Sequence, residues 1–444
     1  MNRTLLPLLC AVALGATAQP QPLVIHEWGT FTSLQDEAGR TLSGINSDDE
    51  PVPAFVHGLN SFLILPDSAG ARFSKGVARS RPDVTMRLET PVVYFHPPKD
   101  AALPLTVDFK VSFRGGLLAE FFPLAQMGDG KDFNKITPAT VGSLTWNRLK
   151  IGTAGTGPKT TERVWLAPRA VTAAAITATN GESEKFLFYR GIGNLNSPLQ
   201  AKRSADGQTL ALHSQLSIGA AALPPMKIRQ LWLASFSADG KCAFRSLPEV
   251  TLGGNGGAAL LKTPANFAPA DYSKAALQQL RTQMHAALRA DGMFADEADA
   301  LLNTWELSYF KSGGLRLFFT VPRDWTDLHL PMEVSVPAEI KRAMIGRIEL
   351  VTPAQRSLMS ELASAVIPLK AQVMNGIAYT NYVPNAAVTT AYRDLGRFRS
   401  ALLLHEIAQR PTESLKTLAQ VNGLPFAQAA PAAARDPARS TTFE

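Results

Sequence analysis

The segment LVIHEWGTFTS, residues 23–33, sets the strongest constraint on how the rest of the chain is arranged. Its β-branched and aromatic residues favour a strand, and successive side chains of a strand point to opposite faces. His26 and Trp28 are therefore expected on one face and Glu27 on the other, with apolar neighbours on both. Because buried polar groups need hydrogen-bond partners, the segment predicts a strand buried on both sides whose charged side chains are paired.

Several further strand patterns follow in the first half of the chain. Residues 84–89 alternate, which places Arg87 and Glu89 together on the polar face, where they can pair. Pro91 interrupts this ladder before the apolar run at 92–95. The alternation at 105–113, the Gly115-Gly116 turn and the apolar run at 117–123 predict a hairpin. Additional strands are predicted at residues 163–166, 185–190, 210–218 and 227–235.

Helical patterns are concentrated in the second half. Apolar side chains recur at helical spacing over 277–288 and 298–309, three short strands are predicted at 315–321, 330–336 and 345–350, and a last helical pair spans 386–421. Thr352-Pro353 has the cap and first-position residues of another helix. The predicted fold class is α+β, with an antiparallel β-sandwich in the N-terminal part and a mixed, mainly helical C-terminal part. The predicted domains are 19–260 and 261–425, divided after a glycine-rich linker.

The two ends of the chain have their own signatures. Residues 1–18 combine a basic residue, an apolar run and the end Ala16-Thr17-Ala18, which predicts a secretory signal peptide cleaved before Gln19. A periplasmic or secreted protein without a membrane span is therefore expected. Its single remaining cysteine, Cys242, cannot form an intrachain disulfide. Residues 426–444 are mostly Ala, Pro, Arg and Ser, which predicts a disordered tail.

Composition and motifs exclude several function classes. The net charge is +7, but Lys and Arg are scattered among acidic residues, so nucleic-acid binding is not favoured. The chain has no His-Glu-x-x-His, no Gly-x-Ser-x-Gly and no dinucleotide fingerprint. The sequence therefore predicts no cofactor.

Charged residues inside apolar runs are the candidates for a site. Glu27, Glu89 and Glu120 lie in such runs, where burial without a partner is costly. They can form buried ion pairs with cations such as Arg190, or they can line a cleft of paired carboxylates and an Arg. We interpret Glu27 as structural. The residues assigned to the cleft are Glu89 and Glu120 as catalytic groups, and His26, Trp28, Arg87 and Arg190 as ligand-binding groups.

A metal site is an alternative interpretation of the histidines. His26, His57 and His96 lie before or within predicted strands and could converge with a carboxylate on Zn²⁺, which takes three protein ligands in catalytic sites. Isolated histidines without motif spacing more often form structural hydrogen bonds. The sequence by itself therefore predicts no metal site.

Four segments carry a resemblance to a family of uncharacterised exported bacterial proteins: HEWGTFTS (26–33), LETPVVYF (88–95), EKFLFYRG (184–191) and GRIE (346–349). Glu297-Ala298, the run 303–305 and the run 321–323 also fit the family's pattern. The family usually has Met at position 88 and Trp at position 121, and both replacements here keep an apolar side chain. The resemblance implies bacterial origin and export, and it supplies no activity.

Two function classes follow from these observations. In the first, an envelope enzyme or binding protein handles a polar polymer such as a glycan, with Glu89 and Glu120 as acid and base, Trp28 as a stacking platform and Arg190 as an anion clamp. In the second, the protein is a non-catalytic structural or interaction module of the cell envelope. An open cleft lined by the two carboxylates favours the first class, and their burial in ion pairs favours the second.

Overall fold

The computed structural model of the chain describes residues 21–47, 52–59, 73–74, 77–128, 135–216, 224–253, 257–366, 372–374, 377–379 and 386–424. The predicted signal peptide and the predicted disordered tail lie outside these residues and stay predictions.

The fold is built on a sheet of fifteen strands. These strands are β1 (Leu23–Gln35), β2 (His57–Gly58), β5 (Met86–His96), β6 (Leu105–Arg114), β7 (Gly116–Phe122), β8 (Gln126–Met127), β9 (Val141–Ile151), β10 (Ile176–Thr177), β11 (Ser183–Glu184), β12 (Leu187–Gly193), β16 (Leu231–Phe236), β17 (Cys242–Leu247), β20 (Gly314–Thr320), β21 (Met332–Val334) and β22 (Ala338–Leu350). The main path runs β11-β10-β9-β7-β12-β5-β1-β22-β20-β16-β17, and the other four strands pair beside it.

The strand predicted from residues 23–33 lies in the middle of this sheet. β1 pairs parallel with β22 over its whole length, and on its other side it pairs antiparallel with β5 from Val24 to Thr32. Ile25 belongs to the core on one face and Trp28 to the core on the opposite face, as the alternation predicts. A bulge in the pairing of β1 with β5 lies opposite Pro91, and a Cβ at Gly29 would lie 3.1 Å from the Cα of Pro91. Because glycine has no Cβ, Pro91 can lie beside position 29 within the paired strands without a steric clash.

The antiparallel β-sandwich predicted for residues 22–260 is wrong, because the main sheet is mixed and takes β20, β21 and β22 from the second half of the chain. The central strand β1 needs a neighbour on each edge, and its parallel neighbour lies more than three hundred residues away in the sequence. Local alternation indicates that a segment is a strand but does not select its partner. The domain boundary at 260 stays a prediction, although the sheet crosses it.

Two local predictions in the first half are also wrong. β6 and β7 do not form the predicted hairpin, because β6 pairs with β9 and β21 while β7 pairs with β12. Residues 163–166, predicted as a strand, lie in helix α2 (Arg163–Arg169). The side chain of Trp165 packs on Phe186 and Phe188, with ring centroids about 5 Å apart. A run of four residues is too short for its apolar pattern to separate a strand from a helix.

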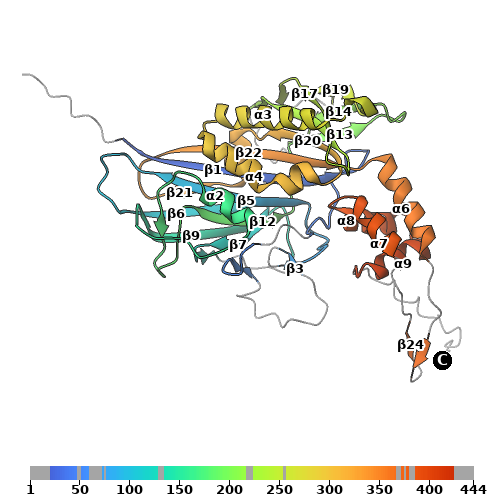
Figure 1. Cartoon of the computed structure of the whole chain (residues 1–444), viewed down its shortest axis with the longest axis horizontal. Helices are drawn as coiled ribbons and strands as arrows, with labels where there is room; N and C mark the ends of the chain where they lie inside the picture. Colours follow the sequence, from blue (N-terminus) through green and yellow to red (C-terminus); the bar gives the residue numbers. More distant parts are fainter. Residues whose placement is uncertain are drawn as a thin grey trace, which may run out of the picture.

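Helices cover the sheet and extend from one end of it (Figure 1). α3 (Lys274–Ala290) and α4 (Ala295–Thr304) pack against the face of β1 that carries Trp28. The π-helix η2 (Leu307–Lys311) follows α4, and α5 (Arg323–His329) follows β20. α6 (Pro353–Ala365), α7 (Ala386–Asp394), α8 (Arg399–Gln409) and α9 (Glu413–Val421) gather at one end of the sheet. Thr352 caps α6 as predicted, accepting a hydrogen bond from the backbone N–H of Gln355.

The remaining strands form small separate sheets. They are β13 (Leu199–Arg203), β14 (Thr209–Ser214) and β19 (Leu261–Pro264) in one sheet, β15 (Met226–Ile228) with β18 (Val250–Leu252), β3 (Phe73–Ser74) with β4 (Val77–Ala78), and β23 (Gln372–Met374) with β24 (Ile377–Tyr379). A short 3-10 turn, η1 (Pro269–Asp271), precedes α3. Among the described residues, no helix is both long and apolar enough to cross a membrane.

Candidate functional site

Glu27 is buried in an ion pair with a residue from the opposite half of the chain. Its carboxylate lies 2.5 Å from the guanidinium of Arg342 on β22, and it accepts a further hydrogen bond from the hydroxyl of Tyr189 on β12. Burial raises the pKa of the Tyr189 hydroxyl, and the neighbouring Glu27 charge adds to this effect. The arrangement agrees with the structural interpretation of Glu27.

Glu89 is fully buried between two guanidinium groups. Arg87 lies 3.1 Å from one carboxylate oxygen, so the predicted pairing of Arg87 with Glu89 is confirmed. Arg397, in the turn before α8, donates to both oxygens at 2.8 and 3.3 Å. Arg87 also donates to the backbone carbonyls of Ile45 and Ser47. The structure thus places both predicted site residues in a buried network rather than in the lining of an open cleft.

Glu120 and Arg190 are direct partners. They face each other on the neighbouring strands β7 and β12 and form an ion pair in which both side chains are largely buried. Glu120 lies on β7 and Glu89 on β5, and β12 runs between these two strands. The catalytic roles of Glu89 and Glu120 stay predictions, but each carboxylate already has an arginine partner.

Trp28 is fully buried and does not face solvent. Its ring packs 6.4 Å from that of Tyr94, within the core between the sheet and α4. The ring is therefore closed to a ligand from solvent in this structure. The predicted role of Trp28 as a stacking platform therefore has no support in the position of its side chain.

Two of the three predicted histidines meet on one carboxylate. His26 Nδ1 lies 2.7 Å from one oxygen of Glu297, and His96 Nε2 lies 2.9 Å from the other. His57 lies apart from them and contacts Glu182 at 2.9 Å. Of the three histidines considered together from the sequence, His26 and His96 therefore converge and His57 does not, and the carboxylate from α4 that joins them had been given no role.

The charge of Glu297 depends on these contacts. Burial by itself raises the pKa of this carboxyl group, but the hydrogen bonds from His26 and His96 outweigh it and hold the pKa at about 2. A pKa below the ordinary value of 4.5 means that the native state favours the ionised form. Its contribution to stability is therefore present above about pH 4.5 and is lost as the pH falls towards 2.

We expect the wild-type protein to lose on the order of 3 kcal/mol more stability than Glu297→Gln between pH 5 and pH 2. Urea unfolding at a series of pH values, in the presence of a metal chelator, measures the difference. If the two proteins lose stability in parallel over this range, the carboxylate is not held in its ionised form by the histidines.

Another buried network is centred on Glu349, near the C-terminal end of β22. Arg316 on β20 lies 2.6 Å from the carboxylate of Glu349, and Arg347 binds the same oxygen with its Nε at 2.9 Å. Both guanidinium groups are almost fully buried, and Nη1 of Arg347 has no hydrogen-bond partner among the described residues. Burial lowers the pKa of Arg316 to about 10, although the Glu349 charge opposes this shift. One carboxylate here stabilises two buried cations.

A pocket of about 630 Å³ lies next to the buried networks of Glu89 and Glu349, and we call it the arginine pocket. It lies between η2, the start of α6 and the segment that joins α7 to α8. Its charged lining residues are Lys311, Arg393, Asp394, Arg397 and Arg399, and its polar lining residues are Ser235, Ser308, Ser312, Thr352 and Gln355. Four cations and one carboxylate therefore line the pocket, and one of the cations, Lys311, pairs with Glu306 at 3.3 Å.

The base of the arginine pocket is held by the buried networks. Arg397 lines the pocket while its guanidinium is bound by Glu89, and Ser312 lines it while accepting a 2.6 Å hydrogen bond from Arg316. Among the described carboxylates, none forms an ion pair with Arg393 or Arg399. The indole of Trp305 also lines the pocket, and its Nε1 has no hydrogen-bond partner among the described residues. The predicted residues Glu89 and Arg87 therefore do not line the pocket, and they contribute to it only by holding Arg397 in place.

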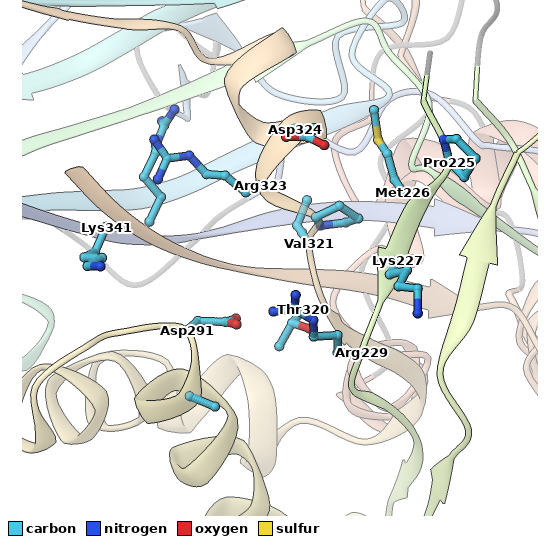
Figure 2. Close-up of a pocket in the computed structure, with 13 residues that line it drawn as sticks. Pro225, Met226, Lys227, Arg229, Asp291, Thr320, Val321, Arg323, Asp324 and Lys341 are labelled. Atoms are coloured by element: carbon cyan, nitrogen blue, oxygen red, sulfur yellow. The ribbon is translucent and has the colours of Figure 1, made fainter. Parts of the chain in front are cut away.

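A second pocket, of about 480 Å³, lies where β20 ends and α5 begins (Figure 2). It is lined by five cations, and four of them have carboxylate partners close by. One of the four is Arg342, the partner of Glu27. Lys227 pairs with Glu249, Arg323 with Asp327, and Lys341 with Glu339, at 2.6 to 2.8 Å. Its positive charge is therefore largely balanced, whereas two cations of the arginine pocket, Arg393 and Arg399, have no carboxylate partner among the described residues.

Sequence reasoning missed the partners that complete these networks. Glu349 and Arg347 met the criterion applied to Glu89, since they are charged residues in an apolar strand, and they could have been found in this way. Glu297 is the third residue of α4 and accepts a hydrogen bond from the backbone N–H of Phe294, so its pattern resembles an ordinary helix cap. Arg397 lies in a turn between helices, and no pattern in the sequence around it indicates a functional residue.

Comparisons with known proteins leave the family of the chain open. No protein-family model matches it, and no curated protein matches its sequence. Among solved structures, it is similar to the Fcho1 Mu homology domain from Danio rerio with bound Eps15 peptide, with a TM-score of 0.31 and 9% sequence identity. The alignment covers 75% of this chain and 98% of that one. A similarity of this size carries no argument about fold or function.

Proposed function

We propose that this chain is an exported bacterial envelope protein that binds an anionic part of a polar polymer, such as an acidic glycan, in the arginine pocket. The observation that carries the proposal is the presence in the pocket lining of Arg393 and Arg399, which form no ion pair with a described carboxylate. The other two cations of the lining, Lys311 and Arg397, are paired with Glu306 and Glu89. Guanidinium groups bind carboxylate and phosphate groups in a bidentate geometry. The hydroxyl and amide side chains beside them suit the hydroxyl groups of a sugar. Export rests on the signal sequence of residues 1–18 and on the resemblance to exported bacterial proteins.

Binding is better supported than hydrolysis. Retaining and inverting glycosidases both need two carboxyl groups that face the scissile bond. Glu89 and Glu120 are instead bound by Arg397 and Arg190. Glu89 contributes to binding indirectly, because it orients the guanidinium of Arg397 in the pocket lining.

A non-catalytic structural or interaction role is the second candidate. It is favoured by the complete burial of Glu27 and Glu89, each of which has an arginine partner distant in the sequence, Arg342 on β22 and Arg397 in the turn before α8. Under this proposal the motif residues join the sheet to its helices, and the arginine pocket has no ligand.

We expect Arg393→Glu to weaken binding of an oligogalacturonate probe by about tenfold or more, because the change reverses one charge at the rim of the pocket. Isothermal titration of the wild-type and variant proteins measures the effect. Arg393 is exposed and belongs to neither buried network, so the variant should keep its melting temperature. Raised salt concentration should weaken the wild-type affinity as well.

Lys227→Glu is the matched control, since it makes the same charge change at an exposed position in the second pocket. Its affinity for the probe should equal that of the wild type. A neutral cello-oligosaccharide of the same length should bind much more weakly than the acidic probe. Equal losses in the two variants would point to diffuse charge attraction, and no binding of acidic probes to the wild type would favour the structural role.

A further inference from the structure

Three potential metal ligands converge near the surface, apart from the arginine pocket. His26 comes from β1, His96 from the end of the neighbouring strand β5, and Glu297 from the first turn of α4. One ligand atom from each residue can be chosen so that all three lie within 4.8 Å of one another. Segments separated by up to 271 residues in the sequence are thus brought to one point.

We propose that His26, His96 and Glu297 form a binding site for a divalent transition-metal ion, with Zn²⁺ as the ion that suits this ligand set. Two imidazoles and one carboxylate are the protein ligands of a recurrent class of zinc site, in which water completes the coordination. The same ligand set also suits Fe²⁺. Nothing in the proposal depends on the function proposed for the arginine pocket.

The charge balance of the cluster supports a cation. Glu297 is fully buried, and among the described residues its ion pairs are with His26 and His96 and with no Lys or Arg. Each of the other buried carboxylates discussed above, Glu27, Glu89 and Glu349, is paired with at least one arginine. Burial of an ionised carboxylate without a full countercharge is costly. A divalent ion between the three side chains supplies that charge.

The surroundings of the cluster hold the ligands in place. The backbone N–H of Phe294 donates to Glu297 at 2.7 Å and fixes the orientation of the carboxylate. The Phe294 ring packs against both imidazoles, with centroids 4.6 and 4.9 Å away. Metal sites are commonly supported by such contacts to the ligands. Phe294 is itself exposed, and the side chain of His96 is 15% exposed, so an ion can enter from solvent.

The distances between the three ligand atoms must change slightly before they can coordinate an ion. Tetrahedral ligands at about 2.1 Å from a zinc ion lie roughly 3.4 Å apart. The nitrogens of His26 and His96 are now 2.7 and 2.9 Å from their carboxylate oxygens. These contacts must open by less than about 1 Å when an ion replaces the hydrogen bonds, and the longest separation among the three ligand atoms, which is at most 4.8 Å, must shorten towards about 3.4 Å. Rotation of the His96 ring, which is the least buried of the three ligands, can provide this movement.

The test uses full-length mature protein without an affinity tag, treated with a chelator and then titrated with Zn²⁺ by calorimetry. We expect one Zn²⁺ per chain, and a loss of affinity of about 100-fold or more in His96→Ala and in Glu297→Gln. Titration with Co²⁺ should give the visible absorption bands of a low-coordinate site in the wild type, and these bands should be absent in His96→Ala.

His57→Ala is the matched control, because His57 also contacts a carboxylate, Glu182, but belongs to a different part of the fold. It should bind Zn²⁺ as the wild type does. The melting temperature should rise with Zn²⁺ in the wild type and in His57→Ala, but not in His96→Ala. The absence of stoichiometric binding by the wild type would overturn the proposal, even if the two ligand variants fail to fold. Retained binding in a folded His96→Ala variant, or lost binding in His57→Ala, would overturn it as well.

Discussion

Glu89→Gln is expected to lower the free energy of unfolding by about 3–5 kcal/mol, one of the two largest effects of a single conservative change in this protein. Glu89 is fully buried, and its carboxylate lies between the guanidinium groups of Arg87 and Arg397. Glutamine keeps the size of the side chain but removes the charge that balances these two cations. Buried cations that lose their countercharge are strongly destabilising, because the low-dielectric interior does not replace the solvation they gave up.

Urea unfolding of the wild-type and variant proteins measures this loss. Glu333→Gln is the control, since Glu333 forms an exposed pair with Lys110 and such pairs contribute about 0–1 kcal/mol. The double variant Glu89→Gln/Arg397→Gln should recover part of the stability, because it removes one of the two cations along with the carboxylate. A loss below about 1 kcal/mol in Glu89→Gln, combined with lost binding of an acidic glycan, would restore Glu89 to a direct role in a site.

Glu349→Gln is expected to have an effect of similar size, about 3–5 kcal/mol. The carboxylate of Glu349 binds both Arg316 and Arg347, and both cations are almost fully buried. These two arginines hold the pKa of Glu349 below its usual range, although burial alone would raise it. Arg347 already has one guanidinium nitrogen without a hydrogen-bond partner among the described residues, so the loss of its carboxylate leaves it poorly compensated.

The matched control for this change lies on the same strand. Glu339 on β22 is exposed and pairs with Lys341, so Glu339→Gln should change the stability by less than about 1 kcal/mol. The Glu349 variant should also bind an acidic glycan more weakly, because Arg316 donates to Ser312 in the lining of the arginine pocket. Equal unfolding free energies for the two variants would show that the buried network adds no net stability.

Much of the local structure could be predicted from the sequence. The alternation in residues 23–33 placed Ile25 and Trp28 on opposite buried faces of a strand, as the two cores show. The same reasoning paired Arg87 with Glu89 and capped α6 with Thr352. These features depend on neighbours within a few residues, so the pattern of apolar, polar and capping side chains is sufficient to determine them.

The tertiary structure alone decided which segments meet. It placed β22 parallel to β1, which made the main sheet mixed, and it brought Arg342, Glu297 and Arg397 to the charged residues of β1 and β5. A buried charge requires a partner, and the sequence therefore indicated that Glu27 would be paired, while it left Glu89 open between an ion pair and a cleft and assigned His26 to ligand binding. It did not determine the partners of these residues, because the partners lie some 270 to 315 residues away and meet them only through the packing of the whole sheet and its helices.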